Sequence, residues 1–443
     1  MARKPLSAAS AGSLVKTSER DPATILLIGT GGREHALAWH LSRSVHVARL
    51  IVAPGNPGTA SLPKTSNVAI SMDDVDGLLE LGCSQQVDLV VIGPEKPLCN
   101  GLSDRFNQAG IFCLGPGAAA ARLEGSKAFA KLFMARHGLP TAPFGVFSSS
   151  QEAMAYIDTH PEARVIKADG LASGKGVVVA DSIEQARDAV CDMLDNGCFG
   201  EAGQRVVVEE RLFGREVSLF GLIHGTDVLY LGSAQDAKRL RDGNQGPNTG
   251  GMGAFSPSQH AADDGLGQHL LQTIAAALMQ EGLFYSGFLY IGLLIDTHGQ
   301  PHILEFNCRL GDPEAQVLLL RMQTDLAAIF LELAQIGTIS GHMIFTTGHA
   351  LGVVLAAANY PEHPSLGTPI CGLEKAEQDG ATIFHMGTRW HEGNLETAGG
   401  RVLTVCAAAN SLEEARQRVY AALPAIRFDG MQWRSDIGIQ DAV

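Results

Sequence analysis

The feature that most constrains the fold is a series of short apolar runs, each of which ends in a glycine or proline loop. The first run, residues 25–28, leads into Gly29-Thr30-Gly31-Gly32, and later runs end in loops at residues 54–58, 93–95 and 115–116. Such runs are typical of strands buried on both faces of a parallel sheet. Helical stretches such as residues 34–41 separate them. The sequence therefore predicts an open parallel α/β sheet with ligands at the carboxyl ends of its strands.

The pattern divides the chain of 443 residues into an extension and three domains. Residues 1–23 are polar and are expected to be a disordered extension or an expression remnant. Residues 24–124 form the predicted N-terminal α/β substrate domain. Residues 125–343 form a second domain, in which the α/β unit at about residues 141–213 is a predicted lid. Residues 344–443 form a small C-terminal α/β domain.

Composition excludes several classes of protein. A formal net charge of −14 argues against non-specific binding to nucleic acid, which needs a basic surface. No apolar stretch is long enough for a membrane span. The 8 cysteines form no Cys-x-x-Cys pair or zinc-type spacing, so reduced thiols in a cytoplasmic protein are expected.

The first glycine loop continues into Arg33 and Glu34 and invites comparison with a dinucleotide-binding fingerprint. The match is poor, because Glu34 stands at the third glycine position and Pro54 stands where a ribose-binding acid is expected. A glycine turn before a helix can still hold a phosphate through free backbone N–H groups. A tight strand–helix turn without a ligand is the alternative.

Two lysines and a second glycine loop predict a triphosphate site. Lys127 and Lys167 can neutralise phosphate oxygens, and the loop at residues 170–176 can close over them with its N–H groups. The loop is not a Walker A sequence, and a mobile surface hairpin is the alternative. The strand at residues 206–210 could read adenine through its backbone, with Glu216 as an acid for ribose hydroxyls.

The strand around Glu305 and Asn307 gives the strongest chemical signal. The two side chains point to one face of a strand, whereas Leu304 and Phe306 are expected to point into the core. A carboxylate and an amide oxygen are hard ligands that suit Mg²⁺ bridging phosphates. Arg309 could hold an anionic substrate group, and the polar face of an exposed edge strand is the alternative. The glycine-rich loop at residues 246–253 predicts backbone wrapped around a ligand.

These motifs together resemble the phosphoribosylamine–glycine ligase family of ATP-grasp enzymes. The matching stretches are Gly-Gly-Arg-Glu-His-Ala at residues 31–36, Leu-Glu-Gly-Ser-Lys at 123–127 and Lys-Ala-Asp-Gly-Leu-Ala at 167–172, with Gly-Pro-Asn-Thr-Gly-Gly-Met-Gly at 246–253 and Glu-Phe-Asn-Cys-Arg-Leu-Gly-Asp-Pro-Glu at 305–314. The resemblance implies an ATP-grasp fold with an N-terminal parallel α/β domain, a lid and central domain, and a small C-terminal domain.

The resemblance also implies a reaction. Glycine attacks the γ-phosphate of ATP, and the amine of 5-phosphoribosylamine attacks the resulting glycyl phosphate, which gives glycinamide ribonucleotide, ADP and phosphate for purine biosynthesis. ATP is the co-substrate and Mg²⁺ or Mn²⁺ the metal, held by Glu305 and Asn307. The implied ATP-binding residues are Lys127, Lys167, Gly174, Lys175, Gly176, Glu209, Leu212 and Glu216. The implied catalytic residues are Arg309, Asp312 and Lys238.

The implied substrate-binding residues come from four loops: Gly32, Arg33, Glu34, Gly55, Asn56, Gly93, Pro94, Glu95, Asp236, Gly250 and Gly251. The partners implied are small molecules only, with no nucleic acid and no membrane, and the chain is expected to be a monomer or weak dimer.

The sequence departs from the family pattern at three places. Ala237 stands where a histidine is common, and Asn244 where an aspartate is usual. The strand at residues 288–295 lacks the further metal-binding acid of many ATP-grasp enzymes, and Asp296 is expected to be a turn residue. Another ATP-grasp ligase or carboxylase, and a non-enzymatic nucleotide-binding relative, are the alternative functions.

Overall fold

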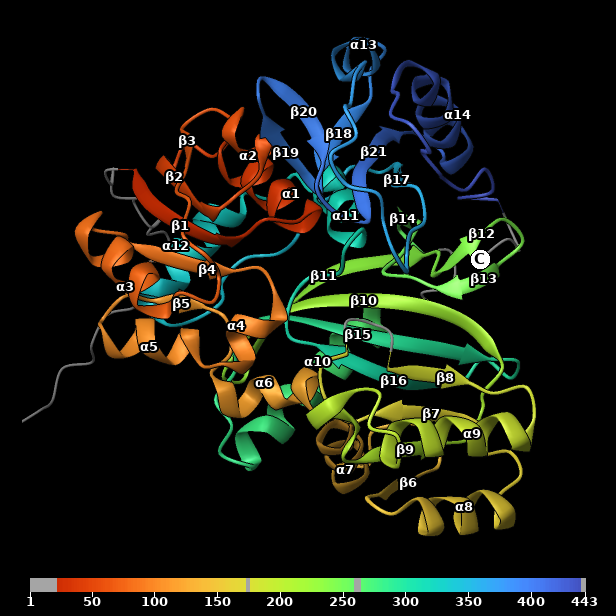
Figure 1. Ribbon diagram of the computed structural model, residues 1–443. Coiled ribbons are helices and arrows are strands. Elements are labelled where there is room, and N and C mark those ends of the chain that lie inside the picture. Colours follow the sequence, from red (N-terminus) through yellow and green to blue (C-terminus); the bar gives the residue numbers. More distant parts are fainter. Residues whose placement is uncertain (1–21, 173–175, 259–263, 440–443) are drawn as a thin grey trace, which may run out of the picture.

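The computed structural model describes residues 22–172, 176–258 and 264–439, and its N-terminal part contains the predicted parallel sheet (Figure 1). Five strands lie in the order β3-β2-β1-β4-β5, and all neighbours are parallel. The elements of this part are β1 (Ala23–Gly29), α1 (Gly32–Leu41), β2 (Val47–Pro54), α2 (Pro57–Ala60), β3 (Thr65–Asn67), α3 (Val75–Ser84), β4 (Leu89–Ile92), α4 (Glu95–Cys99), α5 (Leu102–Gln108), β5 (Cys113–Leu114) and α6 (Ala118–Gly125).

Both faces of this sheet are buried, which explains the continuous apolar runs. Leu26 and Ile28 of β1 belong to one core cluster, whereas Ile25 and Leu27 belong to another. Alternate residues of a strand point to opposite faces, so each face packs against its own layer of helices. The prediction of an open parallel α/β sheet is therefore confirmed.

The lid is a small α/β unit with a core of its own. Its four strands lie in the order β6-β9-β7-β8 and are antiparallel, and α8 and α9 contribute to the same core cluster. This part contains α7 (Lys127–Arg136), β6 (Phe144–Phe147), α8 (Ser150–Thr159), β7 (Val165–Ala168), β8 (Val177–Val179), α9 (Ile183–Leu194), the 3-10 helix η1 (Gly200–Gly203) and β9 (Val206–Glu209).

The central and C-terminal parts share one sheet of eight strands, in the order β16-β15-β10-β11-β14-β17-β21-β18. The short strand β14 joins the two parts, because it pairs with β11 on one side and with β17 on the other. The central elements are β10 (Gly214–His224), β11 (Asp227–Asp236), β12 (Arg239–Arg241), β13 (Gln245–Asn248), β14 (Gly253–Ser256), α10 (Asp264–Gln280), β15 (Ser286–Asp296), β16 (Pro301–Asn307), α11 (Glu314–Arg321) and α12 (Leu326–Ile336).

The C-terminal part adds strands and helices to the far edge of the shared sheet. Its elements are β17 (His349–Ala356), α13 (Leu373–Gln378), β18 (Thr382–His385), β19 (Thr388–His391), β20 (Asn394–Thr397), β21 (Arg401–Ala409), α14 (Leu412–Ala422) and the 3-10 helix η2 (Leu423–Ala425). Across the part of the chain that the structure describes, every helix is too short or too polar to cross a lipid bilayer.

Candidate active site

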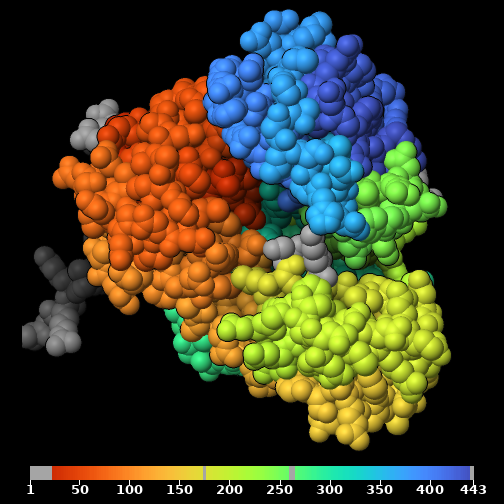
Figure 2. Space-filling view, in the orientation of Figure 1, coloured from red at the N-terminus to blue at the C-terminus, as the bar shows by residue number. Residues whose placement is uncertain are grey.

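The surface is hollowed where the N-terminal domain, the lid and the C-terminal domain meet (Figure 2). Contacts between side chains show which predicted residues meet across these parts. Lys167 of the lid lies 3.2 Å from the carbonyl oxygen of Leu304 on β16, and Arg309 after β16 lies 3.0 Å from Glu95 of the N-terminal domain. The predicted ATP, metal and acceptor residues therefore come from different domains and meet around β16.

A β-bulge on β16 changes one detail of the predicted strand. Glu305 pairs with Gly292 and Ile303 with Leu293, so Leu304 is an extra residue without an opposite partner. Ile303 and Phe306 point into the core, whereas Leu304 is only half-buried. The prediction that Leu304 points into the core is therefore wrong, because a bulge breaks strict alternation.

Glu305 and Asn307 lie together and face the lysines of the site. Their side chains are 3.5 Å apart, from Asn307 Nδ2 to Glu305 Oε1. Burial alone would raise the pKa of Glu305, but Lys238, Lys167 and Lys127 outweigh burial and lower it. The amide oxygen of Asn307 accepts from Arg309, so Asn307 would bind a hard divalent cation beside Glu305 with its oxygen once the amide turns over.

Within the described residues, no group of three His, Cys, Asp or Glu side chains could hold a metal ion. The protein side of such a site would thus be Glu305 and Asn307, with substrate phosphates as further ligands. Gly292 occupies the position opposite Glu305, and Asp296 accepts the backbone N–H groups of His298 and Gln300 at 2.8 Å each. Asp296 is the last residue of β15 rather than the turn residue that was predicted, although its carboxylate stabilises the turn that follows.

Lys127 is placed by the capped start of α7. Ser126 is the N-cap residue and accepts the N–H of Phe129, while Asp169 accepts the N–H of Ala128 at 2.7 Å. The ammonium group of Lys127 lies 3.0 Å from the carbonyl oxygen of Gly170 in the lid loop. Burial lowers the pKa of Lys127 and outweighs the opposite effect of Glu305.

Glu209 holds two buried lysines. Its carboxylate lies 2.8 Å from Lys131 Nζ and 2.8 Å from Lys167 Nζ. Burial lowers the pKa of Lys131 to about 8, although Glu209 opposes the shift. The carboxylate of Glu209, which the family resemblance connects with adenine, is thus engaged in positioning Lys167. Lys131 was not predicted, because it belongs to no chemical motif.

Arg309 is the centre of a second charge network. It forms ion pairs with Glu95 at 3.0 Å and with Glu124 at 2.8 Å, and it donates to Asn307 Oδ1 at 3.2 Å. Burial would raise the pKa of Glu95, but Arg309 and Arg33 lower it to about 2. Burial raises the pKa of Glu124 to about 7, even though Arg309 acts against the shift.

Glu124 accepts the N–H of Cys308 at 2.7 Å and thereby also fixes the chain beside Arg309. It was not among the predicted site residues, although it lies in the Leu-Glu-Gly-Ser-Lys stretch that carries the family resemblance. That stretch was the signal that could have identified it.

Two side chains predicted to bind substrate form hydrogen bonds within the protein. Glu34 accepts the N–H of Gly31 at 2.7 Å and pairs with the guanidinium of Arg33. Gly93 lies so close to the Glu34 carboxylate that a Cβ there would overlap with it. Asn56 donates to the carbonyl oxygens of Thr30 at 2.9 Å and His385 at 3.0 Å. Both side chains therefore shape the loops at the strand ends.

The other N-terminal positions lie in the same loops. Gly32 begins α1, Gly55 follows β2 with a φ of 71°, and Pro94 is the N-cap residue of α4. Gly176 precedes β8 and accepts the N–H of Ala168 at 2.8 Å, whereas Gly174 and Lys175 lie outside the described residues. Leu212 lies between β9 and β10, where the lid joins the central sheet.

Lys238 lies among acids at the end of β11. Its ammonium pairs with Glu216 of β10. Loss of water contact would lower the pKa of Lys238, but Glu216 and Asp236 raise it well above its usual range. Glu216 is therefore paired with a lysine even though it is exposed, and Asp236 contributes its charge nearby.

The glycine-rich loop packs against Asp312 and the C-terminal domain. A Cβ on Gly251, whose φ is 111°, would lie 2.7 Å from Pro313 Cδ. Gly250 donates its N–H to the hydroxyl of Tyr360 at 3.1 Å, and its carbonyl accepts from Arg401 at 2.6 Å. Arg401 also donates to the carbonyl oxygen of Asp312. Tyr360 and Arg401 belong to no sequence motif, and neither was a predicted site residue.

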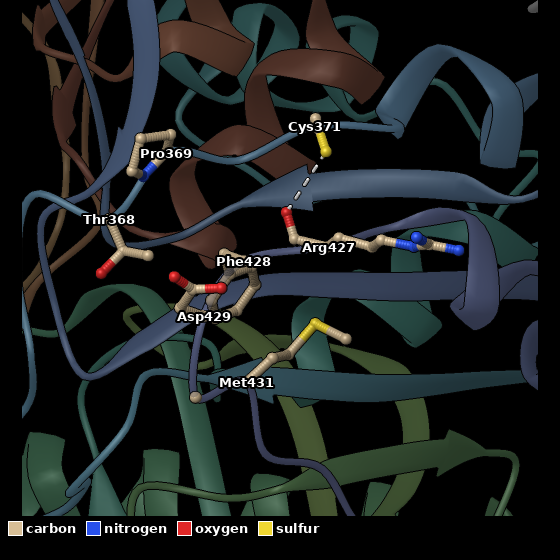
Figure 3. Close-up of a pocket in the computed structure, with 8 residues that line it drawn as sticks. Thr368, Pro369, Cys371, Arg427, Phe428, Asp429 and Met431 are labelled. Atoms are coloured by element: carbon tan, nitrogen blue, oxygen red, sulfur yellow. Dashed lines mark hydrogen bonds between the residues drawn. The ribbon is translucent and has the colours of Figure 1, made fainter.

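A separate groove of about 570 Å³ lies on the C-terminal domain (Figure 3). The thiol of Cys371 points across it to the carbonyl oxygen of Arg427, 3.7 Å away. None of its lining residues is a predicted site residue: Thr368, Pro369, Cys371, Arg427, Phe428, Asp429, Gly430 and Met431.

The four-stranded lid, the glycine loops and the Glu-x-Asn strand facing lysines define an ATP-grasp enzyme. The N, ATP-grasp (A) and C domain models of phosphoribosylglycinamide synthetase match residues 23–124, 125–315 and 350–440. The chain belongs to the phosphoribosylglycinamide synthetase family. The ATP-grasp fold and the family resemblance inferred from the sequence are thus confirmed.

Curated relatives match almost the whole chain. The phosphoribosylamine–glycine ligase of Xanthomonas axonopodis pv. citri is 47% identical over 94% of this chain and 97% of its own length. The enzyme of that name from Escherichia coli O157:H7 is 45% identical over the same shares. A crystal structure of the Thermotoga maritima phosphoribosylamine–glycine ligase has a TM-score of 0.80 at 33% identity, over 93% of this chain and 99% of that one.

More distant structures share the fold alone. The biotin carboxylase of Campylobacter jejuni, solved as a complex with an ATP analogue, has a TM-score of 0.70 at 15% identity, over 93% of this chain and 92% of that one.

Proposed function

We propose that this chain joins glycine to 5-phosphoribosylamine at the expense of ATP, with glycyl phosphate as the intermediate. The main observation in support is the position of Glu305, with Asn307 beside it and three lysines facing it. Such an arrangement neutralises a triphosphate and leaves hard ligands for a divalent cation. Identity of 47% over 94% of the chain to a phosphoribosylamine–glycine ligase supports the substrates.

Phosphoryl transfer depends mainly on position and charge, and the described residues can supply both. Lys127 and Lys167 bind phosphate oxygens from the lid side, and Glu209 keeps Lys167 in place at 2.8 Å. Leu212 and the backbone of residues 209–212 read adenine, and Glu216 binds ribose. Gly174, Lys175 and Gly176 are the remaining proposed ATP-binding residues.

Glu305 and Asn307 would hold Mg²⁺ or Mn²⁺, which when bound draws charge from the phosphates and lowers the barrier to transfer. The two residues present one carboxylate and one amide on the same edge strand. The remaining ligands would come from ATP, because the residue opposite Glu305 on β15 is Gly292, which has no side chain to bind a metal.

The acceptor side is formed by strand-end loops of the N-terminal domain and by the loop after β16. Arg33, Gly32, Gly55, Gly93 and Pro94 bind the phosphoribosylamine, while Glu34 and Asn56 shape the loops that do so.

Arg309, held by Glu95 and Glu124, presents a fixed cation to the acyl phosphate. Lys238, Asp236, Asp312 and the Gly250-Gly251 backbone enclose the reacting groups.

The test is release of ADP with ATP, Mg²⁺ and glycine, with and without phosphoribosylamine formed in the assay. ADP that appears only when glycine and the amine are both present supports the proposal. The Glu305→Gln variant, which keeps the size but loses the charge, should release almost none. ADP release driven by bicarbonate, or by another amino acid, would instead favour a different ATP-grasp ligase or carboxylase.

We further propose that the protein acts in the cytoplasm as a monomer or weak dimer. All eight cysteines are free thiols in the structure, which fits a reducing compartment. Sedimentation at several concentrations tests the assembly state, and a stable tetramer would contradict it.

A further inference from the structure

The hairpin β12–β13 connects two parts of the active site but does not belong to the main sheet. It begins directly after Lys238 and ends directly before Thr249 and Gly250. Its strands form a two-stranded sheet on their own. Two strands alone are marginally stable in water, so the hairpin needs an outside anchor to keep one position.

The C-terminal segment at residues 434–436 supplies that anchor at the tip of the hairpin. Asp242 accepts the N–H of Ser435 at 2.8 Å and also its hydroxyl group. Gly243 donates its N–H to Asp436 Oδ2 at 2.8 Å. Figure 1 shows the hairpin next to the blue C-terminal segment. The anchor thus joins positions about two hundred residues apart, which no sequence motif indicates.

Arg434 fixes the anchor itself. Its side chain is fully buried and donates to both oxygens of Asp436 at 2.7 Å each. Arg434 also donates to the carbonyl oxygen of Arg239 in β12 at 3.2 Å. A forked guanidinium–carboxylate pair holds one orientation, so Asp436 presents its oxygen to the hairpin in a fixed place.

The base of the hairpin transmits this position to Lys238. Thr249 donates to the carbonyl oxygen of Lys238 from its N–H at 2.7 Å and from its hydroxyl at 2.8 Å. Thr249 Oγ1 also accepts the N–H of Gly251 at 3.0 Å. Movement of the hairpin would therefore shift both Lys238 and the Gly250-Gly251 backbone.

We propose that Asp242, Ser435 and Asp436 are positioning residues, which clamp the hairpin and thereby hold Lys238 and the glycine-rich loop in their reactive arrangement. The contacts of the clamp do not depend on the proposed function. Its effect on catalysis does rest on that function, in which Lys238 and the glycine-rich loop act on the acyl phosphate. The role of the clamp predicts a change in kcat, since the ATP phosphate ligands Lys127 and Lys167 lie at the start of α7 and on β7 of the lid, outside the hairpin.

The test compares Asp242→Ala with the parent chain in two assays. Asp242 is exposed, so its removal leaves the buried pair of Arg434 and Asp436 intact. Two hydrogen bonds are lost, and each favours the clamped state over the open one by roughly fivefold. Because trypsin cleaves the open state, its cleavage after Arg239 or Arg241 should accelerate by about tenfold to thirtyfold. The kcat of glycine-dependent ADP release should fall by about fivefold or more, and the KM for ATP should change by a smaller factor, because Lys238 also pairs with the proposed ribose ligand Glu216.

Two further variants keep the result interpretable. Ser435→Ala removes the hydroxyl bond but keeps the N–H bond to Asp242, so its effects should be smaller and of the same kind. Asp379→Ala removes an exposed acid of the same domain whose carboxylate pairs with Lys375, and should match the parent. Unchanged kcat in Asp242→Ala, with or without faster cleavage, overturns the positioning role. An inactive parent chain would instead refute the proposed function, and faster cleavage would still report the clamp.

Discussion

Acidification should weaken the joint between the N-terminal and C-terminal domains, because a buried histidine there can only accept a hydrogen bond. His35 of α1 accepts the N–H of His385 through Nδ1 at 2.8 Å. That nitrogen must be unprotonated in the folded chain. Burial, followed by the neighbouring His385, lowers the pKa of His35 from 6.5 to about 3. Burial lowers the pKa of His385 to about 4.

The direction of the effect follows from where the protons bind. In the unfolded chain both histidines take up a proton near their ordinary pKa of 6.5, whereas in the folded chain they stay neutral down to about 4 and about 3. The unfolded state therefore binds more protons within this window. Stability is complete above about pH 6.5 and falls as the pH drops.

The loss can be estimated at about pH 5, which is 1.5 units below the ordinary pKa of 6.5. Each unit is worth ~1.4 kcal/mol, so His35 accounts for ~2 kcal/mol of lost unfolding free energy. His385 is only half-buried, so we expect it to add less than that.

Urea unfolding at about pH 7 and about pH 5 measures the difference. The variant His35→Gln keeps an acceptor oxygen for the His385 N–H but does not titrate, so it should lose ~2 kcal/mol less than the parent between the two pH values. The exposed His363→Gln controls for a general change in charge and should follow the parent. Equal losses in the parent and in His35→Gln would refute the reasoning.

Further substitutions test the site and its surroundings. Glu209→Gln leaves Lys131 and Lys167 buried without their counter-charge and should destabilise the fold by ~3 kcal/mol or more in urea unfolding. Gly251→Ala should lose ~1–3 kcal/mol in the same assay, because its φ is 111° and Pro313 is close, whereas Gly299→Ala, also at positive φ but with open space around it, measures the backbone effect alone. Arg309→Lys cannot reach Glu95, Glu124 and Asn307 together, so kcat for ADP release should fall by about tenfold or more; an unchanged kcat would show that charge alone suffices. Ala237→His should destabilise by ~2 kcal/mol without raising kcat, while the exposed Asn244→Asp should match the parent in both measurements.

The sequence predicts best what depends on local pattern. The parallel strands of the N-terminal domain follow from apolar runs such as residues 25–28, because both faces of that sheet are buried. The helices α9 (Ile183–Leu194) and α14 (Leu412–Ala422) both begin after a serine that caps the first turn. Propensity and capping act within a few residues, so they can be read directly from the chain.

The features that the sequence does not reveal depend on contacts between distant segments. The bulge at Leu304 is set by the register between β16 and β15. Arg401 reaches Gly250 across 151 positions of sequence. The sequence around Leu304 and around Arg401 looks like that of an ordinary strand. Only the three-dimensional fold therefore shows what each of these two residues contacts.

Position 237 shows how such a contact changes the meaning of a sequence difference. Asp236 and Lys238 face the site, and a histidine between them would suggest a third reactive group. The chain is extended there, so the side chain at position 237 points the other way. Ala237 is 1% exposed and packs in the cluster of Phe255, Leu351 and Val353 from the shared sheet. We therefore expect the missing histidine to remove no group from the reacting centre of this chain, because the side chain at position 237 packs beneath the site.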